Sequence, residues 1–261
     1  MTLGEAIVLG IVQGLAEFLP ISSSGHLVLV EHWLGITSAD LVFEVAVHAG
    51  TLLSVLWYFR RRLWELAESV AGRGESPDAI AVSRGEILYL AIGTIPAGVI
   101  GVLFKDRIES IFADSHVAAS FLMLTGVMLL STRLRRVGDR PLTIRRAWWI
   151  GCAQAVAILP GISRSGSTIS AGLWQGVRPA LAAEFSFLLS IPAVGGAILL
   201  TIPNAWGSGR LGLPHLVGGA AAALTGYAAL RLVFAFLRGG RFALFGVYCL
   251  LVGALASLLL R

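Results

Sequence analysis

Pro160-Gly161-Ile162-Ser163-Arg164-Ser165-Gly166-Ser167-Thr168 decides the fold, because it sets an arginine in a hydroxyl- and glycine-rich turn between two apolar runs. In lipid every backbone amide needs a partner and a charged side chain is costly, so such a turn must line a cavity or be buried in protein. A guanidinium among serine hydroxyls and free amides indicates a receptor for an oxyanion. The structural alternative is a polar hinge in which Arg164 neutralises a buried acid.

The composition around this turn is that of a polytopic membrane protein. Of 261 residues, 56% are hydrophobic and 13% are charged, and the mean hydropathy is +0.83, far above that of a soluble domain of this size. The net charge is +5, but the arginines flank apolar segments, where positive charge fixes topology. We therefore expect the lipid bilayer, and no nucleic acid, as a partner.

The first half of the chain contains one broken hairpin and three longer apolar runs. Residues 7–20 are apolar but too short, at about 1.5 Å per residue, to cross a hydrocarbon core of about 30 Å. A serine-rich turn and a second short apolar piece to about Gly35 follow, so we expect a helical hairpin whose second helix begins near His26. The sequence predicts polar loops over 60–84 and 133–146, and spanning helices over 41–59, 86–104 and 117–131.

The second half repeats this plan. Residues 148–160 are again too short to span, and the run resumes after the arginine turn to about Gly176. The segment Pro20-Ile21-Ser22-Ser23-Ser24-Gly25 aligns with residues 160–166 with one insertion. Spanning helices are predicted over 180–202, 216–237 and 243–260, and small residues form a ridge for close helix packing in each half, at Gly93, Ala97 and Gly101 and at Gly218, Ala222 and Gly226.

An odd number of crossings per repeat inverts the second copy in the membrane, which is the plan of many transporter folds. The sequence therefore predicts an all-α polytopic membrane protein with one membrane domain, 1–261. It would be an inverted-topology repeat, about 1–136 and about 142–261, with six transmembrane helices and two re-entrant helical hairpins that meet near the midplane.

The distribution of positive charge predicts the orientation. With the two basic loops in the cytoplasm, fifteen of the 20 Lys and Arg flank that side and Arg164 lies within the membrane. The outer side keeps four, as the positive-inside rule requires. Both termini are then outside. The four outer residues are Lys105, Arg107, Arg210 and Arg261.

Polar groups converge where the two hairpins should meet. Gln13 and Glu17 stand four residues apart and so share one helix face. The hydroxyls of the first turn can cap a half-helix whose free amides attract an anion, and the second turn repeats this around Arg164. Two helix N-termini and one arginine predict a phosphate cradle. The candidate hydroxyls are Ser22, Ser23 and Ser24 in the first turn and Ser163, Ser165, Ser167 and Thr168 in the second.

An anion receptor needs no carboxylate or histidine, so Glu17 and His26 indicate chemistry. A carboxylate can hold a divalent metal or take a proton. A histidine near a serine can be a general base or a nucleophile.

The stretch Gln13-Gly14-Leu15-Ala16-Glu17-Phe18-Leu19-Pro20-Ile21-Ser22-Ser23-Ser24-Gly25-His26 resembles the (E/Q)xxxE motif and following serine-glycine-histidine of the bacterial undecaprenyl pyrophosphate phosphatases, the bacitracin-resistance family. Residues 160–168 resemble the PGxSRSxxT motif of that family, and residues 182–189 resemble the segment after it. The resemblance implies an inner-membrane hydrolase that converts undecaprenyl pyrophosphate to the monophosphate. It would recycle the lipid carrier for peptidoglycan and cell-wall synthesis and give bacitracin resistance, with its site open to the periplasm.

The resemblance also implies roles for individual residues. Arg164 would bind the pyrophosphate beside Ser163 and Thr168, with Ser22 and Ser165 in the same cradle. Gln13 and Glu17 form the motif associated with a divalent cation, Mg²⁺ or Ca²⁺, although Gln13 stands where many relatives have glutamate. We expect Ser23 to attack phosphorus with His26 or Glu17 assisting, because a serine at a helix N-terminus faces the bound anion. A phosphohistidine at His26 is the alternative.

Two rival interpretations belong to other classes. Inverted repeats with half-helix anion sites also build transporters and lipid flippases. A membrane scaffold would use Arg164 only as the partner of Glu17 or Glu184. The lipid chain length, the choice of metal, lipid flipping and the oligomeric state stay open at this stage.

Overall fold

The computed structural model describes residues 1–36, 41–104, 115–134, 138–208 and 211–259, without side-chain placement at Ser115 and 203–208. Over these ranges the protein is helical, and its only β-type pairing is one isolated bridge between Arg140 and Val177. The helices are α1 (Leu3–Phe18), α2 (Ser23–Leu34), α3 (Leu41–Tyr58), α4 (Arg60–Val70), α5 (Pro77–Leu103), α7 (Ser115–Ser131), α8 (Ile144–Val156), α9 (Arg164–Trp174), α10 (Pro179–Ser208), α11 (Leu213–Arg238) and α12 (Leu244–Leu259), with a short 3-10 turn η1 (Thr132–Leu134).

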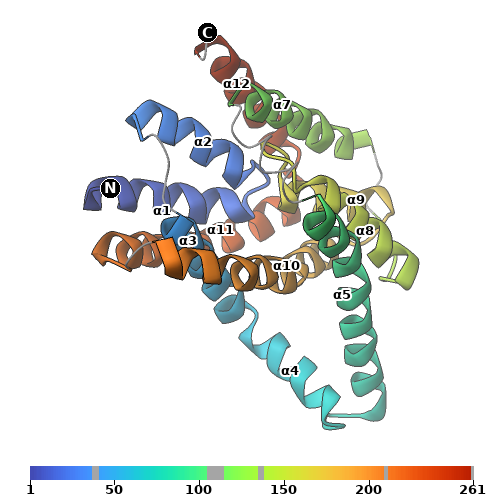
Figure 1. Ribbon diagram of the computed structural model, residues 1–261. Coiled ribbons are helices and arrows are strands. Elements are labelled where there is room, and N and C mark those ends of the chain that lie inside the picture. The colour runs from blue at the N-terminus through green and yellow to red at the C-terminus, as the bar shows by residue number, and fades with distance from the viewer. Residues whose placement is uncertain (37–40, 105–114, 135–137, 209–210, 260–261) are drawn as a thin grey trace.

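Two helical hairpins, α1–α2 and α8–α9, contain the two motif turns (Figure 1). Side-chain caps fix where their second helices begin: Ser22 accepts a hydrogen bond from Gly25 N, and Ser163 accepts one from Gly166 N. The prediction that the second helix of the first hairpin begins near His26 is therefore wrong by three residues. The helix begins at Ser23, because Ser22 alone is the cap.

Within the described residues, five helical segments are long and apolar enough to cross a membrane: α3, α5, α7 together with η1, α10 and α11. The prediction of an all-helical polytopic membrane protein is thus confirmed. The sixth predicted span corresponds to α12, which is apolar but has 16 residues within the described part of the chain.

Residues 60–84 do not form the predicted polar loop. Residues 60–70 form α4, whose apolar side chains recur at Leu63, Leu66 and Val70 in helical spacing. Ser76 then caps α5, which begins at Pro77, well before the predicted start of the span. The high charge of the segment concealed its amphipathic period. The second predicted loop is likewise interrupted by η1, and its last residues belong to α8.

Small residues bring the helices into close contact. α11 packs on α1 and α3, and the predicted ridge at Gly218, Ala222 and Gly226 is buried there. A Cβ at Gly226 would lie 2.8 Å from the Phe18 ring and 2.7 Å from the Ser54 hydroxyl, so only glycine fits. In the second packing, α5 meets α8 where Gly93 lies against Gly151. Gly93 of the predicted small-residue ridge on α5 therefore makes the close contact with α8.

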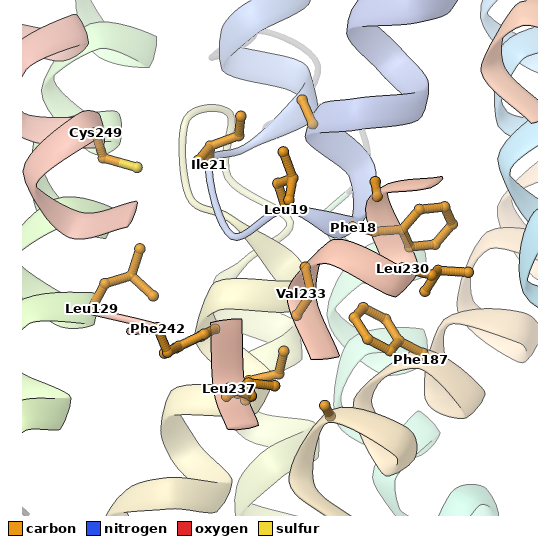
Figure 2. Packing of buried hydrophobic residues seen from close by; sticks show 14 of the residues in the cluster. Phe18, Leu19, Ile21, Leu129, Phe187, Leu230, Val233, Leu237, Phe242 and Cys249 are labelled. Carbon is orange, nitrogen blue, oxygen red and sulfur yellow. The ribbon is translucent and has the colours of Figure 1, made fainter. Parts of the chain in front are cut away.

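The largest apolar cluster among the described residues includes Phe18, Leu19 and Ile21 around the first motif turn (Figure 2). The ring of Phe18 packs edge-on against Phe187 of α10, with centroids 5.8 Å apart. Leu230 and Val233 of α11 belong to the same buried cluster. Lipid tails are as apolar as these rings, so close van der Waals packing holds the helices together here, and it anchors the end of α1, where Glu17 precedes Phe18.

The charge asymmetry stays a prediction. The four cations assigned to the outer side, Lys105, Arg107, Arg210 and Arg261, lie outside the described residues.

Candidate active site

The two motif turns pack against each other. Gly161 N donates to the Ser24 hydroxyl at 3.4 Å, and the Ser165 hydroxyl donates to the Leu19 carbonyl at 3.3 Å. Gly161 adopts φ +88°, and a Cβ there would meet the backbone of Ala118 on α7. The glycine of the arginine motif is therefore required both by its left-handed conformation and by the closeness of α7.

Glu17 is the centre of the polar network. Its Oε1 accepts a hydrogen bond from Arg164 Nη2 at 2.6 Å, which is also a salt bridge. Its Oε2 accepts from the Ser23 hydroxyl at 2.7 Å and from Gln13 Nε2 at 3.3 Å. The side chains of Glu17 and Arg164 are only 9% and 14% exposed. Both charges are thus largely removed from solvent, and each depends on the other.

Ser23 and Arg164 occupy equivalent positions, since each is the first residue of its helix. The free backbone amides and the positive dipole end of α2 and α9 therefore lie beside these two side chains. Ser22 immediately before α2 has φ 69°, which is unusual for a residue with a side chain. Such strain, on the order of 1–3 kcal/mol, clusters at functional sites. The arrangement favours an anion between the two helix ends.

The other predicted cradle hydroxyls lie deeper in the protein. Ser163 is the cap of α9, and its backbone amide donates to Thr125 Oγ1 at 3.1 Å. Ser165 bonds to the first turn, and Thr168 Oγ1 lies 2.5 Å from the Ser186 hydroxyl. Their side chains fix the backbone around Arg164, and all three are buried.

The His26 ring forms its two hydrogen bonds with residues other than Ser23. Its Nδ1 lies 2.8 Å from the Ser22 carbonyl oxygen, and its Nε2 lies 2.9 Å from the hydroxyl of Tyr248 on α12. The hydroxyl of Ser23 is instead engaged by Glu17. Of the two assisting groups considered from the sequence, the carboxylate is the one within reach of Ser23.

Three further residues belong to the site, and two of them, Thr125 and Tyr248, lie outside every motif. Thr125 of α7 donates to the Gly161 carbonyl at 2.9 Å, the Ser186 carbonyl accepts from Arg164 Nη1 at 3.4 Å, and Tyr248 contacts His26. Thr125 is a single hydroxyl residue within an apolar run, and Ser186 lies in the segment 182–189 that resembles the family, where nothing singled it out.

The site contains oxygen atoms of the kind that bind divalent cations. The carbonyl oxygen Oε1 of Gln13 is buried without a hydrogen-bond partner, on the same helix face as Glu17. A buried amide oxygen beside a carboxylate fits a hard cation such as Mg²⁺, which takes few protein ligands and completes its shell with water and phosphate. Among the described residues no group of three or more His, Cys, Asp and Glu could hold a metal.

The fold and the site define a class of protein: a polytopic helical membrane protein in which two hairpin turns enclose a serine, a carboxylate and an arginine between two helix N-termini. The chain belongs to the family of the bacitracin resistance protein BacA, whose model matches residues 6–255. It is 44% identical over 262 residues to an undecaprenyl-diphosphatase of Desulfosudis oleivorans, covering 95% of each chain. It is 42% identical to one of Korarchaeum cryptofilum, covering 99% of this chain and 100% of the relative, and 40% identical to one of Salinibacter ruber over the whole of both chains.

Proposed function

We propose that this protein hydrolyses undecaprenyl pyrophosphate to undecaprenyl phosphate and inorganic phosphate. The reaction recycles the lipid carrier for peptidoglycan synthesis and gives bacitracin resistance. The observation that carries the proposal is the linked set Ser23–Glu17–Arg164, in which one carboxylate binds both a helix-terminal serine and a helix-terminal arginine. Relatives named for this activity support it over nearly the full chain. They do not favour the transporter alternative.

In the mechanism that we propose, the terminal phosphate of the substrate binds to the guanidinium of Arg164 and to the free backbone amides of α2 and α9. Glu17 accepts the Ser23 proton, because its Oε2 lies 2.7 Å from the Ser23 hydroxyl oxygen. The Ser23 oxygen attacks the terminal phosphorus as the bond to the bridging oxygen breaks, and undecaprenyl phosphate leaves with that oxygen. Arg164 stabilises the charge that spreads over the transferred group.

The second half of the reaction restores the enzyme. Water attacks the phosphoserine, the bond between phosphorus and the Ser23 oxygen breaks, and that oxygen takes back the proton from Glu17. Inorganic phosphate leaves with the oxygen and both protons of the water, as dihydrogen phosphate. The same groups thus serve both steps, with Glu17 first as base and then as acid.

The direct test is phosphate release by the purified protein. In detergent with Mg²⁺, wild-type protein should release inorganic phosphate from undecaprenyl pyrophosphate and from farnesyl pyrophosphate. Well-folded protein that releases none from either substrate would exclude the phosphatase function.

We further propose that Mg²⁺ or Ca²⁺ is bound by the Glu17 carboxylate and the Gln13 carbonyl together with the pyrophosphate. The cation would neutralise phosphate charge when bound. The unpartnered Oε1 of Gln13 supports this assignment.

Substitution of Gln13 should change the metal requirement. Gln13→Leu removes one oxygen donor, so we expect the Mg²⁺ concentration for half-maximal activity to rise about tenfold. Gln13→Glu puts a second carboxylate beside Glu17, so we expect a lower melting temperature without metal and a larger rise on adding Mg²⁺ than in wild type. Titration of phosphate release and thermal unfolding with and without EDTA measure these effects. Identical metal titrations of the wild-type and Gln13→Leu proteins would show that Gln13 does not bind the metal.

The membrane arrangement that we propose has two inverted repeats of about 1–136 and 142–261. Six crossings are completed by α12, and the two hairpins are re-entrant from opposite faces. The packing between the repeats supports it. α1 of the first repeat packs on α11 of the second, and its equivalent α8 packs on α5 of the first. The pairs α3–α10 and α7–α12 each join equivalent helices. Both termini would lie outside the bacterial inner membrane, with the site open to the periplasm.

An apolar groove offers a place for the prenyl chain. It lies between α5 and α10 beside Leu63, has a volume of about 630 Å³, and includes Leu90, Gly98, Leu188 and Pro192 in its lining. Leu188 lies two residues beyond Ser186, whose carbonyl accepts from Arg164. A lipid with its phosphates at Arg164 could therefore place part of its chain in this groove.

Filling the groove should weaken binding of the long lipid. A Cβ at Gly98 would meet no atom within 4 Å, so Gly98→Leu should fold and project into the groove. We expect KM for undecaprenyl pyrophosphate to rise about tenfold, equivalent to about 1.4 kcal/mol of binding free energy, because part of the chain loses its packing contacts in the groove, while kcat is unchanged. Gly196→Leu on α10 is the matched control, because its Cβ is equally free and it does not line the groove. Equal KM values for the two variants would exclude this groove.

A further inference from the structure

The ring of His26 is held at both nitrogens. A carbonyl oxygen only accepts hydrogen bonds, so Nδ1, 2.8 Å from the Ser22 carbonyl, carries the proton in the neutral ring. Nε2 is then an acceptor, and the Tyr248 hydroxyl, 2.9 Å away, donates to it. The two rings are also stacked, with centroids 5.6 Å apart and planes 8° from parallel.

Tyr248 is itself fixed against the first motif turn. The next residue, Cys249, is buried, and its thiol lies 3.6 Å from the Pro20 carbonyl oxygen. α12 packs on α7, where Gly246 lies against the backbone of Gly126. Consecutive residues of the last helix thus contact both sides of the turn that carries Ser23.

We infer that Tyr248 is a positioning residue for the reaction, which holds the His26 imidazole in its Nδ1–H tautomer and in a fixed orientation. This inference rests on the proposed function. A hydroxyl both donates and accepts, so when Nε2 takes up a proton, Tyr248 can turn and accept the bond instead. The pair therefore holds His26 in either protonation state.

The same contact decides between two roles of His26. An imidazole attacks phosphorus through an unprotonated nitrogen, and in this site Nδ1 carries the proton while Nε2 is covered by Tyr248. His26 is thus held against the backbone of Ser22, next to Ser23, and the attack on phosphorus belongs to Ser23.

The first test separates the hydroxyl from the ring. Tyr248→Phe keeps the stacked ring and loses the hydrogen bond. We expect kcat for phosphate release to fall about tenfold, with KM within about twofold, because no substrate contact is removed. Tyr227→Phe on α11 is the matched control, since its ring packs against Tyr58 away from the site, and its kcat should equal that of wild type. An unchanged kcat in Tyr248→Phe would overturn the inference.

The second test observes the histidine directly. In protein labelled with ¹⁵N-histidine, the His26 signals are identified by their loss in His26→Gln. Wild type should show a protonated Nδ1 and a hydrogen-bonded, unprotonated Nε2, and Tyr248→Phe should shift Nε2 toward the value of a free ring nitrogen. Identical spectra would overturn the inference. Because these signals do not depend on turnover, they test Tyr248 even if wild-type protein releases no phosphate.

Discussion

Arg164→Ala is expected to reduce phosphate release at least about a thousandfold, the effect of removing an arginine that stabilises a transferring phosphoryl group. Arg164 is the cation that pairs with Glu17 in the network, and it is the first residue of α9. Its planar fork can bind two phosphate oxygens at once. Release of inorganic phosphate at saturating substrate is the measurement.

A purely structural salt bridge also predicts harm, so folding must be measured beside activity. Removing one partner of a buried pair costs about 3–5 kcal/mol, and both side chains are largely buried here. Arg164→Lys keeps the charge beside Glu17 and loses the fork, so it should unfold near the wild-type temperature while its activity falls about a hundredfold or more. If Arg164→Lys is folded and fully active, Arg164 serves only to neutralise Glu17, as in the scaffold interpretation.

Ser23→Ala is expected to reduce phosphate release by about 10⁴-fold or more, the usual effect of removing a nucleophile. The fold should persist, because Ser22 and not Ser23 caps α2. Ser24→Ala is the matched control. Its hydroxyl bonds only weakly, at 3.3 Å to Ser22 and 3.4 Å to Gly161, so its activity should stay within about tenfold of wild type.

The covalent intermediate identifies the attacking atom. The substrate is labelled in its terminal phosphate, and the reaction is quenched in acid during turnover. Label should then remain on the protein, because phosphoserine is stable in acid and phosphohistidine is not. Label that survives acid and is absent from Ser23→Ala supports Ser23. If the label on the wild-type protein is lost in acid, and Ser23→Ala is still labelled when the quench is not acidic, the nucleophile is His26.

The two hairpins could be predicted because their signals are local. A run of apolar residues too short to cross the bilayer, followed by serines or by Ser-Arg-Ser, marks a broken helix wherever it occurs. The same local reasoning failed at α4, where charges obscured an apolar repeat at Leu63, Leu66 and Val70.

The partners within the site could be predicted only in part. Glu17 and Arg164 are 147 positions apart, and the sequence offered Glu184 equally well as a partner. Glu184 lies 3.9 Å from Arg62 of α4 instead. Tyr248 is 222 positions from His26, in an apolar helix without any motif. Such pairings depend on how helices pack, which periodicity does not specify.

The pairing of Glu17 with Arg164 has a consequence for the order in which the chain is made. A ribosome delivers Glu17 to the membrane long before Arg164 has been synthesised, so the nascent first half contains a carboxylate whose cation does not yet exist. Until α9 inserts, that carboxylate must remain hydrated or be protonated. Insertion of the second hairpin would then pair Glu17 with Arg164 and complete the site in one event, so that no partly made chain could act on its lipid.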